Sequence, residues 1–183
     1  FKCHRCGDTQ APVDRCPNCK SWRLLSLGVG IEQVALELRS LLPSSPLFLL
    51  EGESIKTPTQ SEKVIEEYLK TPGAILLGTE LMLAHLRTRV EHSAVVSLDA
   101  LFSIPDYRAG EIVMNLLLQI RALAEKSFTI QTRDSTRPIF AYCVKGNLLD
   151  FFRDELEERK KFKYPPFAVF IKITPPPSRM QEI

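Results

Sequence analysis

The sequence predicts an α/β fold with a mainly parallel sheet, preceded by a small zinc-ribbon-like module. Short runs of nearly continuous apolar residues alternate with stretches of helical length and periodicity. Strands of a parallel sheet have this composition because helices cover both faces of the sheet. The separate module is predicted because four of the five cysteines fall within the first nineteen residues.

The clustered cysteines form two pairs, Cys3-x-x-Cys6 and Cys16-x-x-Cys19, at a spacing typical of zinc sites. Two thiolates three positions apart hold a metal ion from one tight turn, and two such turns complete a tetrahedron of sulfurs. Gly7 directly follows the first pair, where the turn favours a positive φ. Because four sulfurs leave no open coordination position, we expect Zn²⁺ to shape the module and not to activate water.

Two alternatives for the cysteines stay open. A disulfide-stapled secreted module would leave Cys143 as an odd thiol, and no signal peptide is recognised. A redox-active dithiol normally presents one Cys-x-x-Cys pair at the start of a helix, whereas both pairs here lie in a loop-rich stretch. The spacing favours structural zinc over both.

Size and composition narrow the possible functions. A chain of 183 residues with 44% hydrophobic content suits one domain of moderate size plus an appendage. Apolar runs fall well short of the roughly 20 residues needed to span a bilayer, so no membrane partner is predicted. The net charge of +2 is too small to require a nucleic-acid partner.

In the amino-terminal half, apolar periodicity predicts four elements. A short strand at 22–27 is followed by an amphipathic helix at 31–42 and a buried strand at 46–50. A polar helix at 61–70 comes next, with Ser61 as its expected N-cap.

In the carboxyl-terminal half, the alternation of strand and helix continues. Strands are expected at Ala74–Leu77, Ala94–Leu98, Phe128–Gln131 and Ala168–Ile173, and helices at Tyr107–Ala124 and Leu148–Phe162. Gly78-Thr79 ends the first of these strands, at the edge where parallel sheets bind ligands. Gly78 and Thr79 are therefore candidate site residues, although a strand-ending turn also accounts for them.

Asp106 and Arg108 are candidates at the start of the long helix. Asp106 is a natural N-cap, and Arg108 can pair with Glu111 three residues on. Capping and a functional role explain this pair of residues equally well.

Several landmarks occur in an order that resembles a known family. They are CxxCG…CPxCxS, Ile75-Leu76-Leu77-Gly78-Thr79-Glu80, Pro105-Asp106-Tyr107-Arg108-Ala109-Gly110-Glu111, and Leu156-Glu157-Glu158-Arg159 before Tyr164-Pro165-Pro166-Phe167. From about Lys2 to Ile173 the chain resembles the zinc region and second helicase lobe of the primosomal protein N′ (PriA) family of replication-restart DNA helicases. The resemblance implies a zinc-binding module at 1–27, a RecA-like C-terminal helicase lobe at 28–164, and a C-terminal domain start or linker at 165–183.

The family resemblance also implies an activity and partners. Members are ATP-dependent 3′ to 5′ DNA helicases of the bacterial cytoplasm and nucleoid, which bind forked or single-stranded DNA and recruit primosome proteins. Gly78, Thr79, Asp106 and Arg108 would lie on the nucleotide or DNA side of the lobe. The chain has no G-x-x-x-x-G-K-[ST] phosphate loop, so ATP and Mg²⁺ are expected only in a full-length parent. Whether the cysteine pairs share one zinc or belong to two ions stays open.

One departure from the family concerns the arginine fingers. The family stretch Gln-Val-Ala-Gly-Arg-Ala-Gly-Arg corresponds here to Gln119–Lys126, with Leu123 and Lys126 in place of the arginines. The composition of Leu116–Lys126 predicts an uninterrupted helix, on which Arg121 would point about 200° away from the expected finger position. A motor-deficient relative is therefore expected, with residual activity through a rearranged site as the alternative. A non-catalytic zinc adaptor and a dithiol oxidoreductase are the competing functions.

Overall fold

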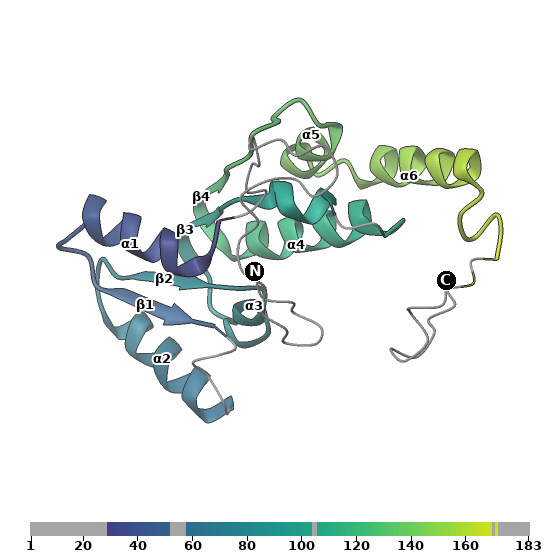
Figure 1. Cartoon of the computed structure of the whole chain (residues 1–183). Coiled ribbons are helices and arrows are strands. Elements are labelled where there is room, and N and C mark those ends of the chain that lie inside the picture. Colours follow the sequence, from purple (N-terminus) through teal and green to yellow (C-terminus); the bar gives the residue numbers. More distant parts are fainter. Residues whose placement is uncertain (1–28, 52–57, 104–105, 170, 172–183) are drawn as a thin grey trace, which may run out of the picture.

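Two strand–helix–strand units form the framework of the protein (Figure 1). The structure is a computed structural model that describes residues 29–51, 58–103, 106–169 and 171, and all structural statements concern these residues. The strands are β1 (Leu47–Leu50), β2 (Ile75–Gly78), β3 (Val90–Val95) and β4 (Ala124–Ile130). The helices are α1 (Ile31–Leu41), α2 (Pro58–Lys70), α3 (Leu81–His85), α4 (Ala109–Leu123), α5 (Pro138–Lys145) and α6 (Leu148–Phe162), with a 3₁₀ helix η1 (Leu98–Ser103).

Both strand pairs are parallel, as the sequence predicts. β1 pairs with β2, connected through α2, and β3 pairs with β4, connected through η1 and α4. Helix α2 contacts both β1 and β2, and α1 contacts β2. The mixed α/β class is therefore confirmed, in the form of two small parallel sheets.

The larger core forms where α4 packs against β3 and β4. Val113 and Leu117 of α4 are fully buried, together with Cys143 of α5. Burying such an apolar side chain completely contributes about 1.5 to 3 kcal/mol. Cys143 is thus a small core residue, and burial raises the pKa of its thiol.

A smaller core lies under the first unit. Leu50 at the end of β1 is fully buried and packs with Ile65 of α2 and Leu86. Helix α1 adds the buried Ala35 on the side that faces the protein. Each unit therefore has its own apolar cluster.

Local sequence sets the ends of the two last helices. Gly146 ends α5 in the left-handed region, with φ of 70°, a conformation that glycine adopts without strain. The side-chain oxygen of Asn147 then accepts the backbone N–H of Asp150 at 3.3 Å, which caps α6. The acidic first turn and the basic last turn of α6 suit the helix dipole.

Two predicted strands have different bounds in the structure. The strand expected at Ala94–Leu98 spans Val90–Val95, and Ser97 ends it with a positive φ of 61°. The strand expected at Phe128–Gln131 begins already at Ala124. In both cases the polar residues at the start of the strand are exposed, so they can belong to it. The prediction ended at these residues because it assumed strands that are buried and apolar along their whole length.

Two predictions about helix ends were wrong. Ser61 does not cap α2, because the helix begins at Pro58, a residue suited to the first helical position, and Ser61 is buried within it. The stretch Leu116–Lys126 is not one continuous helix, since α4 ends at Leu123 and Lys126 belongs to β4. The predicted strand at Ala168–Ile173 lies partly outside the described residues, and residues 168, 169 and 171 are not in a strand.

Candidate functional site

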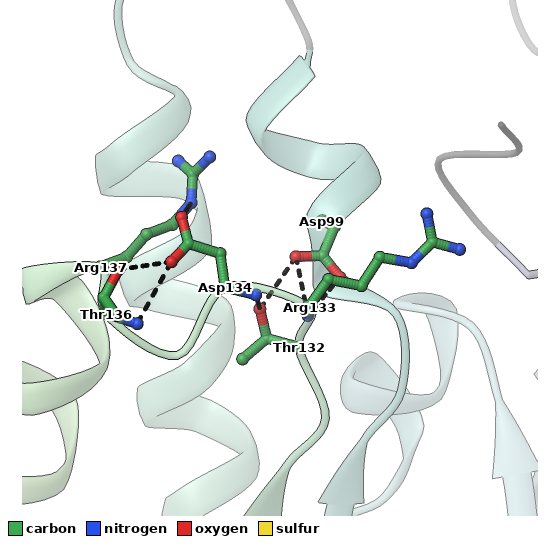
Figure 2. A network of polar contacts seen from close by, with 6 residues as sticks. All are labelled: Asp99, Thr132, Arg133, Asp134, Thr136 and Arg137. Carbon is green, nitrogen blue, oxygen red and sulfur yellow. Dashed lines mark hydrogen bonds and ion pairs between the residues drawn. The ribbon is translucent and has the colours of Figure 1, made fainter.

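One carboxylate joins the ends of β3 and β4. Asp99, just after β3, accepts a hydrogen bond from the Thr132 hydroxyl at 2.8 Å and from the backbone N–H of Arg133 at 3.1 Å. Figure 2 shows this aspartate, in the first turn of η1, directed toward Thr132 and Arg133 after β4. Because the two strands are parallel, this edge holds the carboxyl ends of both, where such sheets bind ligands.

A second carboxylate shapes the loop between β4 and α5. Asp134 accepts hydrogen bonds from the backbone N–H of Thr136 at 3.2 Å and from its hydroxyl at 2.5 Å. Its other oxygen lies 3.3 Å from Nε of Arg137, whose guanidinium carbon lies 4.4 Å from the centre of the Phe102 ring. These contacts fix the loop in front of α5 (Figure 2).

Hydrogen bonding lowers the pKa of both carboxyls. The Thr132 hydroxyl is the main cause for Asp99, with the backbone N–H and charge of Arg133 adding to it. For Asp134 the main cause is the Thr136 hydroxyl. Both aspartates are therefore ionised at neutral pH and accept these bonds as carboxylates.

The same edge presents exposed arginines. Arg133 and Arg137 are both exposed, and in Figure 2 the side chain of Arg133 extends away from Asp99 while its backbone is held. A guanidinium group suits phosphate because its planar fork donates two parallel hydrogen bonds. The arrangement can thus hold cationic groups in place for an anionic ligand.

Asp106 and Arg108 lie before α4 and contact each other. Arg108 itself occupies the N-cap position of α4. The carboxylate of Asp106 accepts hydrogen bonds from the backbone N–H of Arg108 at 2.9 Å and from its Nη2 at 3.1 Å. The predicted pairing of Arg108 with Glu111 was wrong, since Glu111 pairs with Arg159 of α6 at 2.9 Å. Asp106 therefore orders the turn before the helix without being its N-cap.

A cleft of about 1170 Å³ lies between the start of α4 and helices α5 and α6. Tyr107 and Tyr164 stack at its wall with ring centres 5.4 Å apart, and the guanidinium carbon of Arg159 lies 5.1 Å from the centre of the Tyr107 ring. Asp106 and Arg108 line this cleft, to which Gly78 and Thr79 do not contribute. The structure thus leaves the two pairs of candidate residues at different places.

Arg159 is an ion-pair partner for two glutamates. Its side chain is 11% exposed, and its Nη2 lies 2.9 Å from Glu111 and 3.7 Å from Glu155. The closer contact is not aligned as a hydrogen bond, and within the described part of the chain the buried Nε and Nη2 have no hydrogen-bond acceptor. Burial raises the pKa of Glu155, and the charge of Arg159 opposes that shift.

Gly78 and Thr79 end β2, as the sequence predicts. A Cβ on Gly78 would lie 2.9 Å from the backbone oxygen of Leu50 and 2.9 Å from Cβ of Met82, so close packing requires glycine there. The Thr79 backbone N–H donates to the Leu50 oxygen at 3.3 Å, and its own oxygen accepts the N–H of Met82 at 2.9 Å. These contacts account for the local structure of the turn.

In the stretch where the resemblance implies arginine fingers, Arg121 and Lys126 contact other groups of the protein. Nη1 of Arg121 donates to the backbone oxygen of Cys143 at 3.0 Å, near the end of α5. Lys126 pairs with Glu91 at 2.6 Å. Leu123 carries no charge and is the last residue of α4.

The predicted zinc ligands Cys3, Cys6, Cys16 and Cys19 lie outside the described residues. Among residues 29–51, 58–103, 106–169 and 171, no group of three or more His, Cys, Asp or Glu side chains is placed to hold a metal ion. The helices in this part are too short or too polar to cross a bilayer.

Comparison with known proteins gives one consistent similarity. No protein-family model matches the chain. The replication restart protein PriA of Borreliella burgdorferi is 27% identical over 177 residues, covering 93% of this chain and 26% of that protein. The PriA of Bacillus subtilis is 27% identical over 180 residues, covering 95% and 22%, and that of Haemophilus influenzae is 28% identical over 175 residues, covering 92% and 24%.

These relatives bear out the predicted resemblance. The chain is a distant homologue of a region of the replication restart protein PriA and spans about a quarter of the length of the curated relatives it matches. The four candidate residues Gly78, Thr79, Asp106 and Arg108 stay predictions.

Proposed function

We propose that this chain is a lobe of a PriA-like replication-restart protein, which binds forked or single-stranded DNA and supplies no arginine finger for ATP hydrolysis. The position of Arg121 is the observation that supports the absence of an arginine finger. Its guanidinium is bound at the end of α5, at the negative end of that helix dipole. An arginine finger must instead reach the γ-phosphate across a lobe interface.

The neighbouring positions support the same proposal. Leu123 is uncharged and cannot stabilise the negative charge that develops on the transferred phosphoryl group. Lys126 forms an ion pair with Glu91 of the neighbouring strand. A lysine also lacks the planar fork with which arginine contacts phosphate oxygens. Finger function would thus require α4 and its contacts to rearrange.

Binding of DNA is supported by the exposed cations at the sheet edge. Arg133 and Arg137 project from the loop after β4, whose backbone donates hydrogen bonds to Asp99 and Asp134. Arg108 projects from the turn before α4, where its backbone N–H donates to Asp106. Phosphate contacts of this kind position a protein on DNA without reading its sequence. We assign Gly78 and Thr79, with Asp106 and Arg108, to the side of the lobe that meets nucleotide or DNA.

The proposal includes a zinc-bearing module and protein partners. Zn²⁺ would be held by Cys3, Cys6, Cys16 and Cys19, and the module would contact fork DNA or primosome proteins in the bacterial cytoplasm. The chemistry of four thiolates suits a structural Zn²⁺. ATP and Mg²⁺ would bind only in a longer parent that provides a phosphate loop.

Binding of labelled forked DNA, followed by fluorescence anisotropy over a salt series, tests this function. We expect Arg133→Ala to weaken binding about 3- to 10-fold and to reduce the salt slope by about 1. Arg153→Ala is the matched control, because Arg153 is also an exposed arginine but lies on α6, where it pairs with Asp150. Equal binding by wild type and Arg133→Ala would contradict the proposed DNA edge, and binding of a primosome protein without DNA would favour the adaptor function.

A further inference from the structure

Helix α6 carries more apolar surface than its neighbours cover. Phe151 is buried in the larger core, and Leu148 packs against that core. Leu149, Phe152 and Leu156 are instead 80%, 47% and 44% exposed. Figure 1 shows α6 beside α5, at the end of the molecule away from the two sheets. Part of the apolar surface of α6 is therefore left open to solvent.

The three exposed residues, which we call the α6 stripe, lie on one face of the helix. Their spacing of three and four residues brings side chains of a helix next to one another. The same spacing forms the seam along which two helices pack in a coiled coil and the row of anchors with which a helix docks into a groove. Single exposed apolar side chains are ordinary, whereas a contiguous row indicates an interaction surface.

The open flank of the α6 stripe is basic. Arg153 and Lys160 are exposed, and each follows a leucine of the stripe by four positions, which places both beside it. Arg153 pairs with Asp150 at 2.6 Å, and its guanidinium has further N–H groups for a second carboxylate. On the other flank Glu155 is 15% exposed and lies against α4, where a Cβ on Gly110 would collide with its carboxylate.

We propose that the α6 stripe docks an amphipathic helix of a partner protein, whose own apolar row is flanked by aspartates or glutamates. The two apolar rows would be buried against each other. Carboxylates of the partner would lie beside Arg153 and Lys160, which selects an acidic helix over a basic one. This inference does not depend on the proposed function, since it uses none of the residues proposed to bind DNA.

Two other occupants suit this surface less well. In an antiparallel, two-fold pair of α6 helices the same flank would meet itself, so the basic side chains of two copies would repel one another. DNA is disfavoured because α6 carries more acidic than basic residues and the α6 stripe has no hydrogen-bond donor for phosphate. An acidic amphipathic helix satisfies both the apolar row and its flank.

Fluorescence anisotropy with two labelled, covalently stapled helical peptides tests the proposal on the 183-residue chain. Both peptides carry leucines at positions i, i+3 and i+7, and they differ only in having glutamate or lysine along the flank. At low salt we expect the glutamate peptide to bind at least about 10-fold more tightly than the lysine peptide. The double variant Arg153→Glu/Lys160→Glu should reverse this preference.

Two single variants locate the peptide on α6. Leu149→Gln shortens the apolar row without opening the core, because Leu149 is 80% exposed, and should weaken binding of the glutamate peptide about 10-fold. Lys161→Glu is the matched control for Lys160→Glu. Lys161 is also exposed but lies about 100° further round the helix, so its replacement should leave the preference for the glutamate peptide unchanged.

Several results would overturn the proposal. They are failure of the wild-type chain to bind the glutamate peptide, equal binding of both peptides, and unchanged binding in Leu149→Gln with the variant folded by circular dichroism. Light scattering should give a monomer, and a dimer that is lost in Leu149→Gln would mean that a second copy occupies the α6 stripe. Displacement of the glutamate peptide by single-stranded DNA would assign the surface to nucleic acid instead.

Discussion

At the scale of single residues, Asp99 is the side chain on which the candidate edge depends most. It is bonded to both the hydroxyl and the backbone that follow β4, so one carboxylate holds the ends of two strands in register. Asp99 is not among the residues predicted from the sequence, although it directly follows the strand expected at Ala94–Leu98. Its partners could not be predicted, because Thr132 and Arg133 are 33 and 34 residues away.

Replacing Asp99 by Asn should lower the unfolding temperature by a few degrees at pH 7, because charge-assisted hydrogen bonds to the carboxylate become neutral ones. The folded-state pKa of Asp99 lies below its ordinary value of 3.8, so the carboxylate's contribution is present above that pH. It is lost as the pH falls through the folded-state pKa. Thermal unfolding from pH 7 to pH 2.5 measures the difference between wild type and variant.

The difference should shrink below about pH 4 as Asp99 protonates. Glu125→Gln, at an exposed carboxylate of β4, serves as the control and should change little over the same range. A difference between wild type and Asp99→Asn that stays constant down to pH 2.5 would contradict the assigned role of the carboxylate.

At the scale of elements, apolar periodicity predicted most helices and strands but misplaced several ends. β3 begins four residues earlier than expected because Glu91 and His92 are exposed at its start. A pattern of buried apolar residues cannot detect a strand whose side chains face solvent or a cavity. The prediction of a helix over Leu116–Lys126 was wrong for a related reason. Helix propensity is a local property, and it does not include the pairing of residues from Ala124 onward with β3.

Two serines, the buried Ser61 and the partly buried Ser93, provide a test of how the helices cover the sheets. Ser61 of α2 is 1% exposed and its hydroxyl has no hydrogen-bond partner among the described residues, whereas Ser93 of β3 donates to the Ile120 oxygen of α4. Ser61→Ala should therefore stabilise the chain by about 1 kcal/mol, since it removes an unsatisfied buried hydroxyl and favours helix. Ser93→Ala should destabilise it by about 1 kcal/mol, because the helix carbonyl loses its donor.

Urea unfolding of the two variants measures both effects in the same chain. Destabilisation by Ser61→Ala of the same size as by Ser93→Ala would mean that the Ser61 hydroxyl has an acceptor in solution. Opposite signs would support the packing of α2 described above.

At the scale of the whole molecule, the α/β class and the parallel pairing followed from the sequence, but the arrangement of strands into two separate pairs did not. Strand order depends on contacts between segments such as β3 and β4, which are separated by an entire helix. The same limit applied to Arg121. Helical periodicity predicted that Arg121 points away from the γ-phosphate of ATP. It could not predict that the guanidinium donates to the backbone oxygen of Cys143 in α5.

The central claim is that Arg121 does not act as an arginine finger on ATP, and turnover by the intact gene product tests it most directly. ATP hydrolysis should be measured with and without forked DNA, for wild type and for Arg121→Ala. We expect no DNA-stimulated turnover attributable to this lobe, and therefore equal rates for the two proteins at a temperature where both are folded. DNA-stimulated hydrolysis that falls about 10³-fold or more in Arg121→Ala, the loss typical of a removed arginine finger, would contradict the claim.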